Sequence, residues 1–260
     1  MRIIARGPFP GAIACLLGLL CAAGFFPLPA MAVDFLIPGI SLSSVSLVPG
    51  ASVSYLVISE SFGVADSSFV ELRVLRHAKG EIELEIVTGP YPLLKEDRVT
   101  VRLRLAEEIL SIASGEEFRS CLKKILIREG AGDFRAPTAQ ELDDLDVERI
   151  FLRSSDGMER SPLDAKEVAT PAGTFLCDGA RISRRRTQTV RLGGVPAERI
   201  DEEAGELWTS REVPLWGLVK SRVEEKHLTK VSGAASAPAS PRVTVTHSIL
   251  ISYTMSPTRP

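Results

Sequence analysis

The sequence predicts a mainly β (α+β) fold. We expect a curved antiparallel sheet, shaped as a half-open β-barrel, with one or two short helices against its concave face. Apolar and charged residues alternate with a period of two in several segments, as in half-buried strands. Helical patterns are few and short. Strands that are apolar on one side need a cover, which a short helix or the curl of the sheet can supply.

The first strands are expected between residues 68 and 105. Apolar residues alternate with Glu or Arg in "VELRVLR", "EIELEIV" and "RVTVRLRL". The turn at 78–80 makes 68–77 and 81–88 an antiparallel pair. The Glu face of 81–87 and the Arg face of 98–105 suit each other as cross-strand neighbours, with up to about 1 kcal/mol per pair. We interpret these charges as a solvated sheet face and not as a binding site.

Three segments carry helical signals. Residues 106–112 are a short helix candidate, and 116–128 fit either a helix or a strand. Residues 137–145 are a clearer helix, with Thr138 as N-cap and Glu141 completing a capping box. The acidic residues there lack the alternating oxygen ligands and the glycine of a calcium loop, so we interpret them as one side of a solvated helix. These residues are Glu141, Asp143, Asp144 and Asp146.

The second half returns to strands. Residues 173–186 form a long one, and the next is interrupted at Gly193-Gly194. Residues 232–241 are a flexible loop by composition. The segment 242–253 then alternates regularly, so the chain is expected to return to the sheet. One face of it would carry Val243, Val245, His247, Ile249, Ile251 and Tyr253. We expect eight to eleven strands in a single β-rich domain, 33–260.

The first 32 residues have the pattern of a signal peptide. Arg2 and Arg6 precede an apolar run, and Ala30-Met31-Ala32 is a cleavage pattern. The alternative of an uncleaved anchor is weaker, because the run is short and is followed by Pro27 and Pro29. A lipoprotein is weaker still, because Cys21 follows Leu20 where a small residue is expected. We therefore expect a periplasmic or secreted protein with no membrane span after cleavage.

The net charge and the cysteine content restrict further the class of protein that this chain can belong to. Residues 33–260 carry 29 basic and 33 acidic side chains, a net charge of −4, which gives no nucleic-acid footprint. Cys121 and Cys177 remain after cleavage. In an oxidising compartment they either form a disulfide that joins the two halves of the fold or stay as separate buried thiols.

Catalytic and metal-binding patterns are missing. His77, His227 and His247 are scattered, with no ligand partner at the spacing of a metal site. No nucleophile elbow occurs, and no Lys-Ser/Thr follows Gly193-Gly194. We interpret Arg184–Arg186 as a solvated strand end in preference to a lipid-headgroup contact. Another set of charged residues has the composition of an acid–base site, but any protein surface offers such a set, so it is not specific. These residues are Glu202, Glu203, Glu206, Arg199 and Arg211. We expect no enzyme and no cofactor.

Both tryptophans lie in "ELWTSREVPLWGLVK", residues 206–220. Pro214 and Gly217 indicate a bend between a strand that ends near Trp208 and one that begins near Gly217. Two interpretations follow. The rings of Trp208 and Trp216 seal a corner of the core, or they line the rim of an apolar cavity together with Leu215 and Leu218.

The tract "VATPAGTFLCDGARI…GELWTSREVPLWGLVKSRVEE" resembles a pattern of bacterial exported proteins. It joins a "PAGTF" strand start, Pro171 to Phe175, to a "W-x-S-x-x-V-P-L-x-G-x-V-K" element, Trp208 to Lys220. That pattern is similar to the half-open β-barrels of the periplasmic lipoprotein carriers LolA and LolB, whose curved sheet holds acyl chains. The resemblance covers about a quarter of the chain and bears on fold more than on activity. No ligand residue is carried over.

Three function hypotheses follow. The first is a non-enzymatic extracytoplasmic binding module that carries an acyl lipid or a lipidated partner in an apolar cavity. The second is a structural or protein-interaction component of the cell envelope, which uses a sheet edge or the loop 232–241. The third is a hydrolase, which would need a nucleophile near one of the three histidines.

Overall fold

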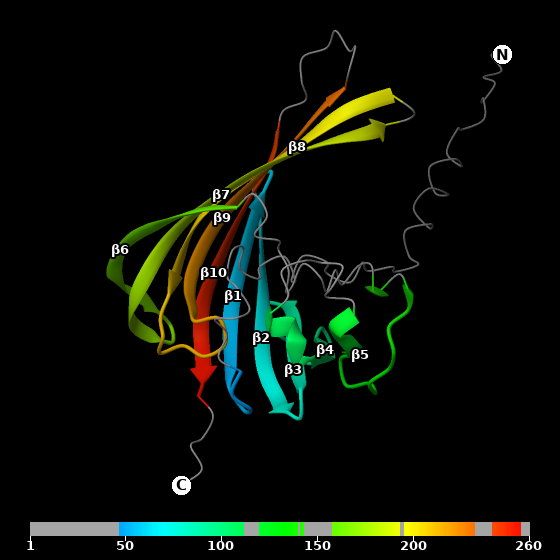
Figure 1. Cartoon of the computed structure of the whole chain (residues 1–260), viewed down its shortest axis with the longest axis vertical. Coiled ribbons are helices and arrows are strands. Elements are labelled where there is room, and N and C mark those ends of the chain that lie inside the picture. Colours follow the sequence, from blue (N-terminus) through cyan, green and yellow to red (C-terminus); the bar gives the residue numbers. More distant parts are fainter. Residues whose placement is uncertain are drawn as a thin grey trace, which may run out of the picture.

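One ten-stranded antiparallel sheet dominates the computed structural model, which describes residues 47–111, 120–139, 141–142, 158–192, 195–231 and 241–255. The strand order is β5-β4-β3-β2-β1-β10-β9-β8-β7-β6 (Figure 1). The bounds are β1 Ser52–Ser61, β2 Val64–Ala78, β3 Glu81–Pro90, β4 Val99–Ala106, β5 Leu122–Glu129, β6 Glu159–Thr170, β7 Gly173–Leu192, β8 Val195–Thr209, β9 Leu218–Val231 and β10 Arg242–Thr254. The predicted curved antiparallel sheet is confirmed. Of the segment 116–128, residues 122–128 lie in strand β5, and 116–119 lie outside the described residues.

Pairing of the first strand with the last holds the two halves together. β10 lies between β1 and β9, so the expected return of the chain to the sheet is confirmed. The turn between β2 and β3 also follows the prediction, with Lys79 and Gly80 at φ 58° and 74°. The two open edges, β5 and β6, do not pair with each other among the described strands. At one of them the sheet coils, because β6 contacts β9 and β10 as well as its partner β7.

A β-bulge in β10 corrects one sequence interpretation. Tyr55 pairs with Leu250 but Ser54 pairs with Ser252, so Ile251 is an extra residue. Val243 to Ile249 alternate as predicted, but Tyr253 lies on the opposite face, because a bulge shifts every later side chain by one position. The buried face of β10 is that of Ser248 and Leu250, which are 1% and 0% exposed.

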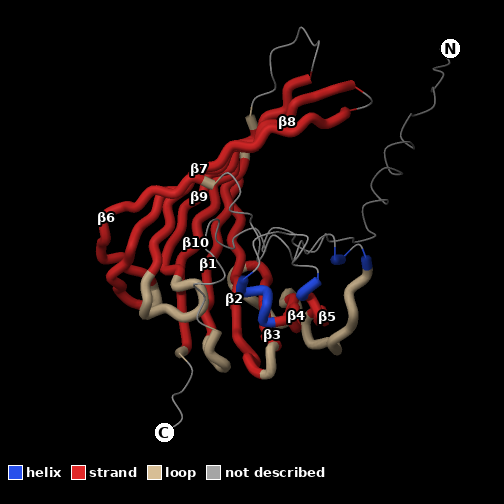
Figure 2. The backbone as a smooth tube through the Cα atoms, viewed as in Figure 1, coloured by secondary structure: helices blue, strands red, loops and turns tan. Residues whose placement is uncertain are grey.

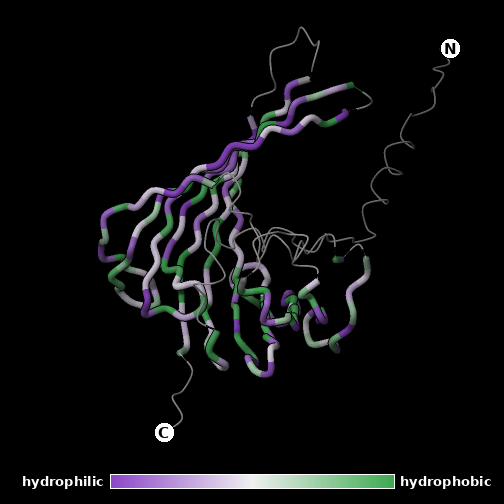
Figure 3. The backbone as a smooth tube through the Cα atoms, in the orientation of Figure 1, coloured by the Kyte–Doolittle hydropathy of each residue, from purple (hydrophilic) through white to green (hydrophobic). Residues whose placement is uncertain are grey.

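The core face of the sheet is defined by the buried side chains of β1: Val53, Tyr55 and Val57. Apolar residues from all ten strands join them in one cluster. Alternation with polar residues on the outer face is visible as alternating colours along the strands (Figure 3). The hydroxyl of Tyr55 donates to the carbonyl oxygen of Leu218 at 3.1 Å, which ties β1 to the start of β9. Burial raises the pKa of Tyr55, so this hydroxyl stays a donor.

Helices contribute less than predicted, and the expected one or two helices against the concave face are not found among the described residues (Figure 2). The segment at 106–112 is a single 3₁₀ helix, η3 Glu107–Ser111, which places Ile109 in the core. A strongly curved sheet brings side chains of its own distant strands together, so it needs less helical cover. No helix in the described part of the chain is long and apolar enough to span a membrane.

The predicted capping box is present at the start of the third helical segment. The Thr138 amide donates to Glu141 Oε2 at 2.7 Å, and the Glu141 amide donates to Thr138 Oγ1 at 3.2 Å. The hydrogen bond from Arg135, followed by that from Thr138, lowers the pKa of Glu141 to about 2. Residues 143–145 lie outside the described residues, as do 1–46 and 232–240, on which the signal-peptide and flexible-loop predictions depend.

The predicted charge ladder is confirmed on the outer face. Glu85 accepts from Arg102 Nε at 2.7 Å, and Glu83 accepts from Arg104 at 2.7 Å. The two pairs differ in burial, because the Glu85 side chain is 9% exposed and that of Glu83 is 25% exposed. Arg102 also lies over the ring of Phe134, 4.1 Å from its centroid. The predicted pairing of the two charged rows is therefore present, but Glu85 is nearly buried and not solvated as the sequence interpretation had it.

We expect Glu85→Gln to lower the free energy of unfolding by about 1–2 kcal/mol, because it weakens charge-assisted hydrogen bonds at a nearly buried carboxylate. The matched variant Glu83→Gln should cost less than about 0.5 kcal/mol, because its pair is solvated. Urea denaturation of both variants measures the difference. Equal losses of unfolding free energy in the two variants would contradict the explanation that burial of the carboxylate sets the cost.

Candidate functional site

A pocket of about 390 Å³ lies between β6 and the outer face of β8, β9 and β10. The residues that line it are Lys166, Glu167, Val168, Ala169, Glu206, Trp208, Lys220, Ser221, Arg222 and His247. The strand register explains why these side chains lie together. Trp208 is opposite Lys220, Glu206 is opposite Arg222, and Arg222 is opposite His247. Since cross-strand partners share a face, these five side chains stand together on the outer face.

Trp208 is buried although it stands on the outer face, because β7 lets its ring approach closely. A Cβ atom on Gly179 would lie 2.4 Å from the Trp208 ring and 2.8 Å from Leu163 Cβ. Glycine at this strand position is therefore required by the close approach of the indole. On the other side, Lys166 Nζ lies 3.6 Å from the centroid of a Trp208 ring. The indole is thereby held between β7 and β6 and is 8% exposed.

The other residues predicted for a cavity rim lie in the core. Leu215, Trp216 and Leu218 are 2%, 8% and 0% exposed, and of the four predicted rim residues only Trp208 lines this pocket. The predicted bend is present. Ser210 N–H donates to the Gly217 carbonyl oxygen at 2.8 Å, and Leu215 has φ 61°. For Trp216 the structure favours the core interpretation. The pocket at Trp208 is also more polar than the apolar cavity that the sequence suggested.

Basic side chains dominate the charge of this Trp208 pocket. Lys166 comes from β6, Lys220 and Arg222 from β9, and His247 from β10. Burial, followed by the positive charge of Arg222, lowers the pKa of His247. His247 was expected to be a core histidine. Its side chain is in fact half-buried and faces a cationic hollow.

The two cysteines are separate thiols in this structure. Both Cys121 and Cys177 are buried and free. Burial, followed by the charges of Asp178 and Glu212, raises the pKa of Cys177, which favours the protonated thiol. Of the two alternatives left open by the sequence, the structure has the unbonded one.

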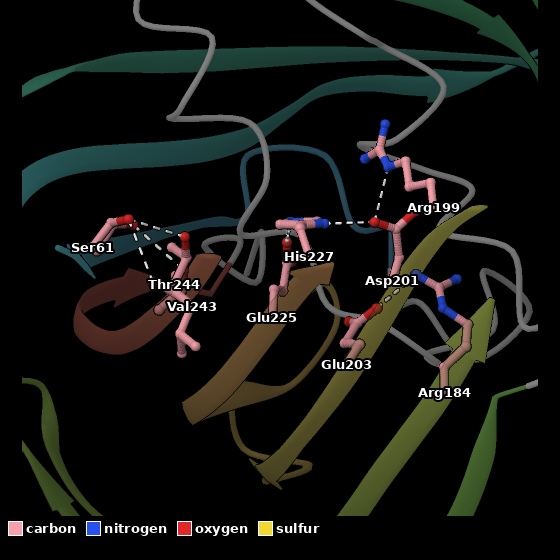
Figure 4. Close-up of polar contacts among 11 residues, drawn as sticks. Ser61, Arg184, Arg199, Asp201, Glu203, Glu225, His227, Val243 and Thr244 are labelled. Atoms are coloured by element: carbon pink, nitrogen blue, oxygen red, sulfur yellow. Dashed lines mark hydrogen bonds and ion pairs between the residues drawn. The ribbon is translucent and has the colours of Figure 1, made fainter. Parts of the chain in front are cut away.

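A second polar pocket, of about 230 Å³, lies at the far end of the core face, where β7, β8 and β9 extend past the other strands (Figure 1). In the close-up, Asp201 accepts from Arg199 Nε at 3.0 Å and contacts His227 Nδ1 at 2.6 Å (Figure 4). Burial disfavours the Asp201 carboxylate, but the hydrogen bonds from His227 and Arg199 outweigh it and lower the pKa of Asp201.

A buried ion pair stands beside this group. Arg184 donates to Glu203 at 2.6 Å, with side chains that are 11% and 6% exposed. Arg184 was expected to be a solvated strand end, and this interpretation is wrong, because the core face at this end of the sheet is polar. An imidazole beside a carboxylate is half of a hydrolytic triad. Among the described residues that line this second pocket, however, none is Ser, Thr or Cys.

Sequence reasoning missed the cationic pocket and only touched the second one. Of the charged set named from the sequence, Arg199, Glu202 and Glu203 line the second pocket, but their partners there were not predicted. The contact of His227 with Asp201 depends on the β8–β9 register, which pairs them directly. The cationic pocket depends on the coiling of β6 toward β9 and β10. The alternation of 219–225 was a usable signal, since it places Lys220 and Arg222 on one side of the strand.

Comparisons with known proteins add little to this geometry. No protein-family model matches the sequence, and no curated protein matches it. One similar solved structure is a candidate exported protein with a YmcC-like fold from Bacteroides fragilis, with 8% identity, a TM-score of 0.34, and coverage of 81% of this chain and 98% of that chain. Another is a candidate lipoprotein from Parabacteroides distasonis, with 11% identity, a TM-score of 0.35, and coverage of 83% and 99%. Likenesses at this level carry no argument about function.

Proposed function

We propose that this chain is a non-enzymatic, extracytoplasmic binding module that holds a lipid or a lipidated partner at the Trp208 pocket. The observation that carries the proposal is the pocket of about 390 Å³ beneath the coiled edge of an open sheet, with a fixed indole in its wall. Trp208, Val168 and Ala169 offer apolar surface, and the polar groups around them would orient an amphiphile. The predicted signal peptide places such a module outside the cytoplasm.

An amphiphile suits this lining better than a wholly apolar guest. A hydrocarbon alone would leave the pocket's charged side chains desolvated without partners, which is costly. A molecule with an apolar chain and a polar head can cover the indole and keep the charges paired. The resemblance to LolA and LolB suggested an acyl ligand, and the lining is compatible with the first carbons of such a chain near Trp208.

Native mass spectrometry with solvent extraction tests the proposal. The mature protein, purified from its own cell envelope, should carry an acyl lipid. Trp208→Phe, which keeps an apolar ring but loses the larger indole surface, should reduce the bound fraction several-fold. The matched variant Trp216→Phe should keep it, because Trp216 lies in the core. A bare mass, with no uptake from phosphatidylglycerol vesicles, would overturn the proposal.

A second candidate function is an envelope component that binds another protein. The observation in its favour is the β1–β2 turn, where Phe62 and Val64 are 79% and 68% exposed. Phe62 has φ 52°, a backbone conformation that bulky residues rarely adopt. If this turn contacts a partner, Phe62→Ser should abolish a cross-link to that partner in intact cells and leave lipid content unchanged. Unchanged cross-linking would remove this candidate.

A further inference from the structure

We propose that the Trp208 pocket recognises a phosphate-type anion through Lys166, Lys220 and Arg222, with His247 as a fourth donor. This inference rests on the proposed function, because it assigns the headgroup of the same ligand. The three permanent cations come from two strands that are not paired with each other, β6 and β9. Convergence of cationic donors from separate elements is the usual way to surround a phosphate group.

Ion pairs with the protein's own carboxylates do not neutralise these three cations. Among the described residues, neither Lys166 nor Lys220 takes part in an ion pair, and Arg222 reaches only Glu224, at 3.8 Å. Of the two carboxylates in the lining, Glu206 lies 3.4 Å from Arg181, whose guanidinium does not line the pocket, and Glu167 forms no ion pair with a described residue. The positive charge of the pocket is therefore incompletely neutralised by the protein.

The outer face of β3 and β4 shows how the same sheet treats charges that serve only its stability. There Glu85 is opposite Arg102 and Glu83 is opposite Arg104, each in a close ion pair. At the pocket, Arg222 is opposite Glu206 on one side, without a close ion pair between the two, and opposite His247 on the other. Like charges in directly opposed positions destabilise a sheet, so protonated His247 is unfavourable there without an anion.

The position of Lys166 is fixed without consuming its hydrogen-bond donors. Its ammonium group lies over the Trp208 ring at 3.6 Å, a cation–π contact that leaves the N–H groups available to a ligand. The indole thus has two roles in this geometry. Its face positions Lys166, and the surface of its ring that lines the pocket is available to the apolar part of the ligand.

The pH response of His247 follows from its surroundings. Burial and the nearby cations Arg222 and Lys220 lower the pKa of His247, while Glu60 opposes them. The other charged groups of the lining are Lys166, Glu167 and Glu206. A bound anion would favour the imidazolium and raise the pKa of His247, so binding takes up a proton and strengthens as the pH falls below neutrality.

Isothermal titration calorimetry of the full mature chain with three probes tests the inference. The probes are dodecyl phosphate, dodecyl maltoside and inorganic phosphate, each below its micelle concentration where it has one. We expect dodecyl phosphate to bind at least about tenfold more tightly than either of the others. Lys220→Gln with Arg222→Gln should reduce its affinity at least about tenfold. Lys226→Gln with Lys230→Gln, the same loss of two positive charges on the same strand outside the pocket, should change it less than about twofold.

The other outcomes separate this inference from the proposed function. Equal affinity for the two dodecyl probes would overturn the anion site and leave a lipid-binding module. Equal affinity for inorganic and dodecyl phosphate would keep the anion site and overturn the lipid function. Absence of binding by all three would overturn both. His247→Gln should flatten the pH dependence of dodecyl phosphate binding relative to wild type, and since the probe titrates equally in both proteins, the difference isolates His247.

Discussion

Replacing Trp208 with alanine is expected to lower the free energy of unfolding by about 3–5 kcal/mol, the range for deletion of a large buried aromatic side chain. The indole is 8% exposed and packs against Gly179, Leu163 and the Lys166 ammonium. Its removal would leave a cavity between β6, β7 and β8 that those strands can close only by losing their present contacts. Thermal and urea denaturation, each with far-UV circular dichroism, measure the loss.

A double-mutant cycle shows whether this cost arises at the contact between the indole and Gly179. In the wild-type background, Gly179→Ala forces a methyl group to within 2.4 Å of the Trp208 ring, so it should destabilise by about 1–3 kcal/mol. In the Trp208→Ala background that clash is gone, although Leu163 Cβ remains 2.8 Å away. We therefore expect a coupling energy of at least about 1 kcal/mol between the two positions. Additive effects would show that the ring does not depend on Gly179.

The sheet could be predicted because its signals are local. Alternation of Ile82, Leu84 and Ile86 with glutamates identifies a half-buried strand from seven residues, and the following arginine-rich strand supplies the complementary charges. The capping box needs only Thr138 and Glu141. Each of these interactions joins residues that are close in sequence or lie in successive strands, so the pattern itself contains the geometry.

The candidate site could not be predicted because it depends on register and on coiling. His227 meets Asp201 only in the observed pairing of β8 with β9. Lys166 reaches Trp208 in the observed pairing of β6 with β7 and of β7 with β8, which includes a register shift between Leu163 and Lys166. The bulge at Ile251 is likewise invisible to periodicity, since an extra residue is recognised only once its partner strand is known. Trp208 could be singled out from the sequence, but its partners could not.

The close approach of β8 and β9 beside the pocket gives the second large effect. Gly205 pairs with Val223, and a Cβ atom there would lie 2.5 Å from the Arg222 carbonyl oxygen and 3.0 Å from Val223 Cα. These are backbone atoms, which cannot rotate away as a side chain can. Alanine in place of a strand glycine is normally stabilising by about 0.5–1 kcal/mol, because it restricts the unfolded chain. Here we expect the opposite sign, with Gly205→Ala destabilising by about 1–3 kcal/mol.

The same variant connects the fold to the proposed site, because the backbone that must move carries the Arg222 side chain into the Trp208 pocket. Gly205→Ala should therefore weaken dodecyl phosphate binding at temperatures where the protein is still folded. Ala204→Val is the matched control: Ala204 is exposed on the outer face but does not line the pocket, so its substitution should change stability by less than about 0.5 kcal/mol and leave binding unchanged. A raised urea midpoint for Gly205→Ala would show that β9 can yield, and binding should then be retained as well.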